Sequence, residues 1–436
     1  MNPTGNHKPN KAGFACLYLE RYSSGPGWEL PPPDPDLFLS VVIPAYKEPD
    51  IETSLIALLS CYPPGVRWEI LVVVNYPENS SREIIDLSLK TRVQIARASE
   101  GLARSDVSIH ALWLPDMPKK HAGVGLARKA GMDEAVRRFN VIGRPEGILV
   151  SFDADSACAP DYLSEIVAFY KTHSKARTAN IYFEHPLEGQ LDPACYRSIG
   201  EYELYLRYIR LAIERTGHPH AIHTVGSSFS LRALTYVRAN GMGRYQAGED
   251  FYFLHKCVQL GQFYEINTTT VYPSSRESDR VAFGTGATIR KQLRCDEPLS
   301  VYSLSAFSWL TGFIPELETL YANIRSGSVN GITRDAAIPE IWEFIDQIGL
   351  DTKIHELIGA TASYPTFRHR FFAWFNGFLV LRYLNELHAS AFTKSPVFTE
   401  ASALAKQEGM PVANNVRELL CTYRDFEKQR GIRRIT

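Results

Sequence analysis

A chain of 436 residues, 45% hydrophobic and 22% charged, has the size and composition of two or three globular domains. Its 47 Lys and Arg residues nearly balance its 48 Asp and Glu residues, so no overall field favours nucleic acid or an anionic bilayer as a partner. The seven cysteines form no Cys-x-x-Cys pair, which argues against a disulfide framework or a thiolate zinc site and fits a reducing cytosol. No apolar run is long enough to span a membrane, so we expect a cytoplasmic protein without a transmembrane segment, with peripheral contact at the inner face of a membrane left open.

Strands and helices alternate in the first part of the chain. Residues 1–37 are rich in Pro, Gly and Asn and predict an N-terminal extended arm. The pattern then predicts right-handed β-α-β units in a Rossmann-like α/β domain, with a mostly parallel central sheet and helices on both faces. The expected strands are 38–44, 69–75, 108–114 and 148–152, and the expected helices are 51–61, 80–102, 123–139 and 161–173.

Polar side chains follow three of these strands. Ligands of such sheets bind beyond the carboxyl ends of the strands, so we expect Tyr46, Glu48, Asn75 and Asp153 to gather there. Asp153 and Asp155 are separated by one small residue, and alternate residues on an extended chain point the same way. Both carboxylates can therefore face one hard cation, or a ribose and a diphosphate together. A polar strand end that caps the next helix is the alternative interpretation.

A second acidic pair lies further along the chain, where the alternation weakens. Glu249 and Asp250 open a predicted helix, after a turn at residues 241–243. Acids at a helix start are favoured by the helix dipole, so helix capping is an alternative to a catalytic role. Before this turn we expect strands at 178–184 and 226–231 and helices at 192–216 and 232–239.

Four segments, taken in this order and spacing, resemble the family 2 glycosyltransferases with the GT-A fold, over about residues 39–272. SVVIPAYKE (40–48) resembles the opening strand and nucleotide-pocket turn of that family, and FDADSACAPDYL (152–163) resembles its Asp-x-Asp segment. GVGLARKAGMDEA (123–135) is similar to its Gly-rich helix, in which small residues and Arg128 face the donor. GMGRYQAGEDFYFLHKCVQLG (241–261) resembles its Gly-Gly-Phe turn and Glu-Asp helix.

The resemblance implies a metal-dependent, inverting glycosyltransferase of hexosyltransferase type, which moves a sugar from a nucleotide-diphosphate sugar to an acceptor hydroxyl. It places Mn²⁺ or Mg²⁺ at Asp155 and Asp153, a general base at Asp250 and an orienting group at Glu249. The sugar, the base, the acceptor (a saccharide, a lipid-linked or a small molecule) and a homodimer are left open. The donor-binding residues that it implies are Pro44, Ala45, Tyr46, Glu48, Asn75, Arg128, Asp153, Ala154 and Arg280.

The chain departs from the family pattern at several positions. Asn75 stands where many relatives carry an acidic residue that reads the nucleobase, Lys129 where an Asn is common, and Lys256 where an Arg is usual. The Gln-x-x-Arg-Trp element of processive relatives is absent, which favours transfer of one sugar at a time. The loop at 273–286, with Arg276 and Arg280, is a candidate lid over the diphosphate, and a solvated connecting loop is the alternative.

From Pro298 onward the composition changes to helical, aromatic-rich stretches. We therefore expect a catalytic domain at 38–297 and a helical C-terminal domain at 298–436, with helices at 300–325, 335–348, 367–391 and 400–430. The aromatic and basic segment 367–384 favours a buried helix over an interfacial or dimer surface. His218, His220 and His223 lie near a predicted strand, and hydrogen bonding within the protein is favoured over metal binding.

Two other functions fit the coarse pattern. A sugar-phosphate nucleotidyltransferase should show a Gly-rich, Arg-containing loop after the first strand, and AYKEPD (45–50) has neither feature. A non-catalytic sugar-nucleotide-binding or scaffold protein would retain the fold without its acids, whereas Asp153, Asp155 and Asp250 are all present.

Overall fold

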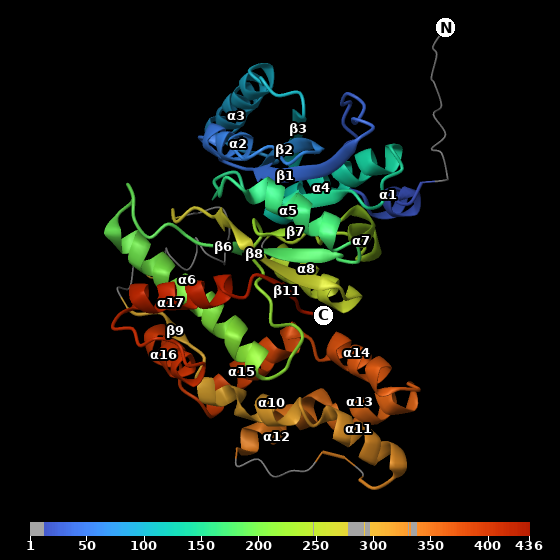
Figure 1. Cartoon of the computed structure of the whole chain (residues 1–436), viewed down its shortest axis with the longest axis vertical. Coiled ribbons are helices and arrows are strands. Elements are labelled where there is room, and N and C mark those ends of the chain that lie inside the picture. Colours follow the sequence, from blue (N-terminus) through green and yellow to red (C-terminus); the bar gives the residue numbers. More distant parts are fainter. Residues whose placement is uncertain (1–12, 247, 278–291, 293–296, 330, 333–337) are drawn as a thin grey trace. The chain divides into compact units, whose positions relative to one another are not determined.

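The predicted β-α-β region forms a parallel sheet. In a computed structural model of the chain the strands lie in the order β3-β2-β1-β4, each parallel to its neighbour (Figure 1). They are β1 (Leu37–Ala45), β2 (Arg67–Pro77), β3 (Val107–Met117) and β4 (Ile148–Ser151). The structure describes residues 13–246, 248–277, 292, 297–329, 331–332 and 338–436.

Helices connect and cover these strands, at nearly the predicted positions. They are α2 (Ile51–Leu59), α3 (Arg82–Glu100), α4 (Val124–Val141) and α5 (Tyr162–Thr172). Helix α4 packs on β1 and β2, and α3 packs on β2 and β3. A Cβ at Gly131 of α4 would lie 2.5 Å from Val42 Cγ1 and 2.8 Å from Val73 Cγ2, so this glycine allows the helix to approach the sheet. One of the small residues expected to face a donor therefore packs against the sheet instead.

The sheet continues beyond β4 in the order β7-β6-β8-β11, and β5 pairs with β8. β7 is antiparallel to both β4 and β6, whereas β6 and β8 are parallel. The predicted α/β fold class with a helical C-terminal region is confirmed. These elements are β5 (Ala157–Cys158), β6 (Thr178–Phe183), β7 (Phe229–Arg232), α7 (Ala233–Arg238), α8 (Glu249–Leu260), β8 (Phe263–Tyr272) and β11 (Ile432–Arg434).

The N-terminal arm is not simply extended as predicted, because it contains helix α1 (Cys16–Tyr22). The Tyr18 hydroxyl donates to Asp133 Oδ1 of α4 over 2.6 Å, and Lys129 Nζ lies 3.0 Å from Asp133 Oδ2. Asp133 is fully buried, and its carboxylate also accepts from Ser24 N at 2.6 Å and from the Tyr236 hydroxyl at 3.1 Å. A polar anchor that the sequence of the arm does not reveal therefore fixes α1 on α4.

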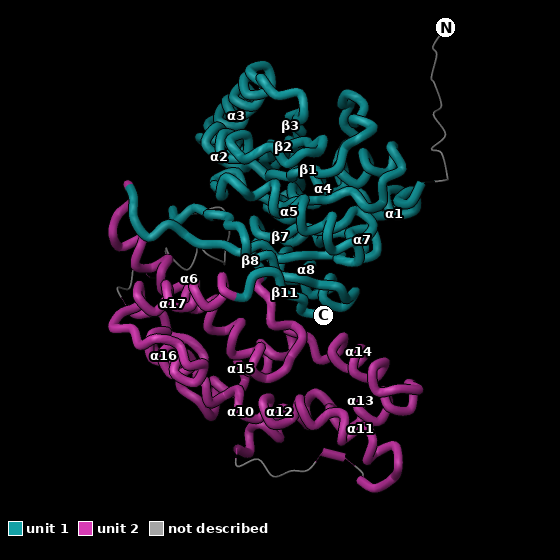
Figure 2. Tube along the Cα trace, in the orientation of Figure 1, with its two compact units in different colours: residues 1–189, 224–287, 430–436 teal, residues 190–223, 288–429 magenta. Residues whose placement is uncertain are grey.

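The chain divides into two compact units, whose limits differ from the predicted domains (Figure 2). The first comprises 1–189, 224–287 and 430–436, and the second comprises 190–223 and 288–429. The segment 190–223 belongs to the second unit because its helix α6 (Pro193–Arg215) packs on α16 (Val397–Gln407) and α17 (Val416–Lys428). The last residues return to the first unit because β11 pairs with β8.

The second unit is helical, with more breaks than the sequence predicts. The expected helix 367–391 is two helices. The first ends at Trp374 with Phe375 as its C-cap, and Asn376 caps the second, with its Oδ1 accepting from Phe378 N at 3.0 Å. Besides α6, α16 and α17 the unit contains β9 (Ser300–Val301), the 3₁₀ helix η1 (Leu304–Phe307), α10 (Ser308–Phe313), α11 (Leu317–Ser326), α12 (Pro339–Ile348), α13 (Leu350–Gly359), α14 (Tyr364–Trp374), α15 (Gly377–Ser390) and β10 (Ser395–Pro396).

Replacing Asn376 by Ala should destabilise the second unit by about 1 kcal/mol, the usual cost of losing a side-chain N-cap. Chemical denaturation of the Asn376→Ala variant measures this loss. Asn376→Ser is the matched control, because its hydroxyl can still accept from the first turn of α15. Equal destabilisation by both substitutions would contradict the capping role.

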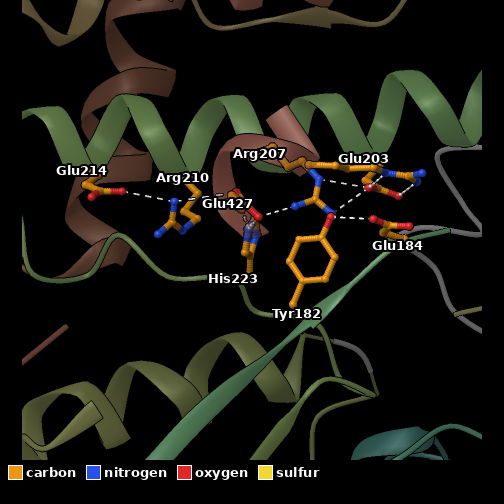
Figure 3. A network of polar contacts seen from close by, with 9 residues as sticks. Tyr182, Glu184, Glu203, Arg207, Arg210, Glu214, His223 and Glu427 are labelled. Carbon is orange, nitrogen blue, oxygen red and sulfur yellow. Dashed lines mark hydrogen bonds and ion pairs between the residues drawn. The ribbon is translucent and has the colours of Figure 1, made fainter. Parts of the chain in front are cut away.

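A buried ion cluster joins α6 and α17 within the second unit (Figure 3). Arg207 is fully buried and pairs with Glu203 at 2.8 Å and with Glu427. Glu203 also accepts from Arg424 Nε at 2.8 Å, and His223 Nε2 lies 3.1 Å from Glu427 Oε1. Buried charges of this kind are tolerated only when paired, and here they link residues far apart in the sequence.

The clustered histidines have structural partners in this unit, as the favoured interpretation predicts. His218 Nε2 lies 2.8 Å from the Phe375 carbonyl oxygen, and His223 belongs to the ion cluster. Burial lowers the pKa of His218 to about 3 and that of His220 to about 4, so both are neutral. Over the part of the chain that the structure describes, no helix combines the length and the apolarity needed to cross a bilayer.

Candidate active site

Arg128 of α4 is the centre of a buried polar cluster at the carboxyl end of β4. Its guanidinium donates to Asp153 Oδ1 at 3.0 Å, to Ser151 Oγ at 2.9 Å and to the Gly226 carbonyl oxygen at 3.1 Å. Its Nε donates to Glu249 Oε1 at 3.2 Å. The structure therefore brings Asp153 and Glu249, two predicted site residues from separate segments, to the predicted site residue Arg128.

Asp250 adjoins this cluster. A Cβ at Gly226 would lie 2.7 Å from Arg128 Nη2 and 3.3 Å from Asp250 Oδ2, so both side chains reach the space that a glycine leaves open. Burial and the neighbouring Glu249 carboxylate raise the pKa of Asp250 to about 7, and Arg128 opposes the shift. A carboxylate that titrates near neutrality is suited to accept a proton from a hydroxyl.

The geometry of α8 bears on the alternative that its acids only cap the helix. The N-cap is Gly248, whose φ of 71° is a left-handed conformation, and no side chain caps it. Glu249 is buried and directed to Arg128, whereas Asp250 Oδ1 accepts from the next backbone N–H, that of Phe251, at 2.8 Å. Asp250 Oδ2 does not accept this hydrogen bond from Phe251. Capping therefore does not account for Glu249, and accounts for only one oxygen of Asp250.

Arg276 joins the other aspartate of the Asp-x-Asp segment to the end of β1. Its Nη2 lies 2.8 Å from Asp155 Oδ2, and the same guanidinium donates to the Glu48 carboxylate. Glu48 is almost fully buried, whereas the Arg276 side chain remains 28% exposed. Each aspartate of the segment thus has its own arginine partner, Arg128 for Asp153 and Arg276 for Asp155. Sequence reasoning named Arg276 and Glu48 separately but did not pair them.

The strand ends supply the rest of the predicted donor site. Pro44 and Ala45 end β1, followed by Tyr46, while Asn75 lies in the last part of β2. Asn75 is 1% exposed, and its Oδ1 has no hydrogen-bond partner among the described residues. A buried amide oxygen without a partner is costly, so it is a candidate acceptor for a ligand N–H.

A serine that the sequence did not single out holds the Asp-x-Asp segment. Ser54 Oγ of α2 lies 2.7 Å from the carbonyl oxygen of Ala154 and 2.8 Å from that of Ser156. Ala154 is buried, and Ser54 holds the backbone between the two aspartates through the Ala154 carbonyl oxygen. The sequence analysis did not single out Ser151 and Gly226 as partners of Arg128 either. The position of Ser151, at the strand end just before the aspartates, was the available signal. Arg280, and with it most of the candidate lid, lies outside the described residues.

The Asp-x-Asp segment presents two partly exposed carboxylates. The side chains of Asp153 and Asp155 are 34% and 22% exposed, and carboxylate oxygens are the ligands that Mg²⁺ and Mn²⁺ prefer. Within the described ranges, no group of three His, Cys, Asp or Glu side chains could hold a metal. These residues fit a cation that takes its other ligands from phosphate and water.

Comparisons with known proteins found no match by sequence and distant matches by structure. No family model and no curated protein matches the sequence. Among solved structures, S. aureus TarS 1–349 in complex with UDP-GlcNAc has a TM-score of 0.36 at 15% identity, covering 57% of this chain and 61% of that one. S. aureus TarS has a TM-score of 0.36 at 14% identity, covering 80% of this chain and 55% of that one. A mycobacterial protein has a TM-score of 0.33 at 15% identity, covering 61% of this chain and 78% of that one. The chain thus spans about three fifths of the TarS fragment, and scores this low carry no argument about function.

Proposed function

We propose that this chain is a glycosyltransferase that moves one hexosyl group from a nucleotide-diphosphate sugar to an acceptor hydroxyl, with inversion and with the aid of Mn²⁺ or Mg²⁺. The observation that carries the proposal is the juxtaposition of Asp153, Glu249 and Asp250 around Arg128, with an acid whose pKa is about 7. The four motifs that resemble family 2 glycosyltransferases support the same conclusion.

Asp250 is the general base in this proposal. In its ionised form it accepts the proton of the acceptor hydroxyl as the oxygen attacks the anomeric carbon, which gives inversion in a single displacement. Arg128 limits the rise of the Asp250 pKa, so that the base form is populated near neutral pH. Glu249 is held by Arg128 and orients the groups at the start of α8.

The strand ends bind the donor in this proposal. Asn75 contacts the nucleobase through its unpaired Oδ1, and Asp153, held by Arg128, contacts the ribose. Asp155, together with Asp153, would hold the divalent cation. When bound, that cation neutralises the charge that develops on the leaving diphosphate.

Arg276 has a second role in donor binding. A guanidinium binds phosphate oxygens as readily as carboxylates, often through two parallel hydrogen bonds. Arg276 is partly exposed and bound to two acids, so a diphosphate can draw it away from Asp155. That exchange would free the Asp155 carboxylate for a cation at the moment the donor binds.

The test is a thermal-shift panel of UDP-, GDP- and dTDP-sugars, each with and without Mn²⁺. A nucleotide present at about 100 times its Kd should stabilise the protein by about 2.7 kcal/mol. We expect one nucleotide to stabilise the wild type, with a larger shift when Mn²⁺ is present. The metal-dependent part of the shift should disappear in Asp155→Ala.

Asp161→Ala is the matched control, since Asp161 follows the same segment and accepts from Thr269 at 2.6 Å, away from the arginine pairs. It should retain the Mn²⁺-dependent shift. No shift of the wild type with any nucleotide would overturn the donor-binding proposal. A shift that persists unchanged in Asp155→Ala would overturn the assignment of the metal.

A further inference from the structure

Two thiols are in contact beside the Asp-x-Asp segment. The Sγ atoms of Cys61 and Cys158 lie 3.6 Å apart, close enough for a hydrogen bond between them. Cys61 follows α2, and Cys158 belongs to β5, which comes directly after Asp155. Both cysteines are free. The scattered spacing of cysteines in the sequence gave no sign of this pair.

The surroundings favour a thiolate at one of these positions. The hydrogen bond from Cys158 lowers the pKa of Cys61, with a further contribution from Arg104, whose Nη1 donates to the Cys61 carbonyl oxygen at 3.2 Å. The same hydrogen bond, with burial, raises the pKa of Cys158. Of the two thiols, Cys61 is therefore the one that ionises more readily. The Tyr162 hydroxyl, buried and without a hydrogen-bond partner among the described residues, interacts electrostatically with both thiols.

We propose that Cys61 and Cys158 are a redox modification site, which a small hydroperoxide converts to a disulfide. The Cys61 thiolate attacks the peroxide, breaking its O–O bond, to give a sulfenic acid and the corresponding alkoxide or hydroxide. The Cys158 thiol then attacks that sulfur, forming the S–S bond and releasing water. The two sulfur atoms lose two electrons in total, which reduce the peroxide. Thiol exchange restores the starting pair.

The position of the pair ties this chemistry to the proposed donor site. Bond formation brings the sulfur atoms from 3.6 Å to about 2.0 Å. The backbone around Asp155 and Cys158 is already attached to α2 and to the residue after Cys61. Ser54 Oγ of α2 donates to the carbonyl oxygens of Ala154 and Ser156, and Tyr62 N donates to that of Pro160 at 2.7 Å. Formation of the disulfide therefore displaces the backbone that carries Asp155. This consequence, unlike the disulfide itself, rests on the proposed function.

Peptide mapping tests the modification directly. The full chain is treated with hydrogen peroxide, its remaining thiols are alkylated, and the digest is examined by mass spectrometry. We expect a cross-linked peptide pair that contains Cys61 and Cys158 and disappears after dithiothreitol. Neither Cys61→Ser nor Cys158→Ser should give it, whereas Cys421→Ser, which removes an exposed thiol, should behave as the wild type. Full alkylation of both cysteines after oxidation, or only irreversible sulfinic acid at Cys61, would overturn the proposal.

Nucleotide binding provides the second measurement, with UDP and Mn²⁺ as the probe. Oxidation should weaken binding at least about tenfold, because an ångström-scale shift of a binding group is costly, and dithiothreitol should restore it. Cys158→Ser should show no change on oxidation, with a melting curve that reports whether the variant is folded. A disulfide without any effect on UDP binding would overturn the coupling to the donor site. If the reduced protein binds none of the nucleotides of the donor panel, the proposed function fails, while the mass spectrum still decides on the disulfide.

Discussion

Replacing Asp250 by Asn is expected to reduce turnover by about 100-fold to 10,000-fold, the usual contribution of a positioned general base. The amide has the size of the carboxyl group but cannot accept the proton of the acceptor hydroxyl. Binding of the donor should change little, because the donor contacts proposed above come from Asn75, Asp153, Asp155 and Arg276 and not from Asp250. The measurement is kcat with the donor that the nucleotide panel identifies, together with the Kd of the corresponding nucleotide.

The pH profile separates this role from a structural one. The base must be ionised, and the pKa of Asp250 is raised to about 7, so the rate should fall about tenfold for each pH unit below 7 and level off above it. In Asp250→Asn the residual activity should not show this fall in rate below pH 7. Above pH 7 the free energy of unfolding of Asp250→Asn should equal or exceed that of the wild type. The substitution removes a buried carboxylate whose ionisation is unfavourable in the folded protein. Asp192→Asn, which keeps an N-cap on α6, is the matched control and should retain both rate and profile.

An outcome that would refute the assignment is a variant Asp250→Asn with normal kcat and a normal acid limb. Loss of activity accompanied by loss of the cooperative melting transition would instead indicate a structural role. The Kd for the nucleotide then decides between these cases, since a folded donor site binds it and an unfolded one does not.

The central sheet could be predicted because the residue pattern of each of its strands and connecting helices lies within one short stretch of sequence. Runs such as FLSVVIP at 38–44 have the apolar, β-branched pattern of buried parallel strands, and a helical pattern follows each. The strands that were missed lack that regular context. β8 contains three consecutive threonines, and β11 is a short basic segment at the end of the chain that becomes a strand only by pairing with β8. Pairing across such distances is a tertiary property.

The sequence motifs contain the acids of the candidate site, but the sequence does not show which residues pair with them. Asp153, Glu249 and Asp250 stand in recognisable motifs, whereas the pairing of Arg276 with Asp155 spans a sequence separation of 121 residues. The sequence offers many arginines and no rule for choosing among them. The same limit applies to Cys61 and Cys158, which are 97 residues apart and meet only because α2 packs beside β5. Motifs therefore indicate candidate groups, and the fold shows which residues pair with them.

Arg128→Met should destabilise the first unit by about 3–5 kcal/mol, the cost of removing one partner from a buried ion pair. Arg128 is 2% exposed and donates to Asp153 and Glu249, so its loss leaves carboxylates clustered without a counter-charge. Methionine keeps much of the apolar volume of the arginine stem, so charge and hydrogen bonds are the main losses. Urea denaturation at pH 8 measures the effect.

The destabilisation by Arg128→Met should shrink as the pH falls. Without Arg128, which opposes the rise of the Asp250 pKa, that pKa should move further above 7, so the carboxylates take up protons more readily and their repulsion is relieved in acid. At pH 6 the variant should therefore lie closer to the wild type than at pH 8. Arg82→Met is the matched control, because Arg82 is 83% exposed and its pair with Asp86 should contribute only about 0.3–0.5 kcal/mol. A loss that is independent of pH would mean that Arg128 acts mainly through packing, and the charge balance proposed for the catalytic base would then be wrong.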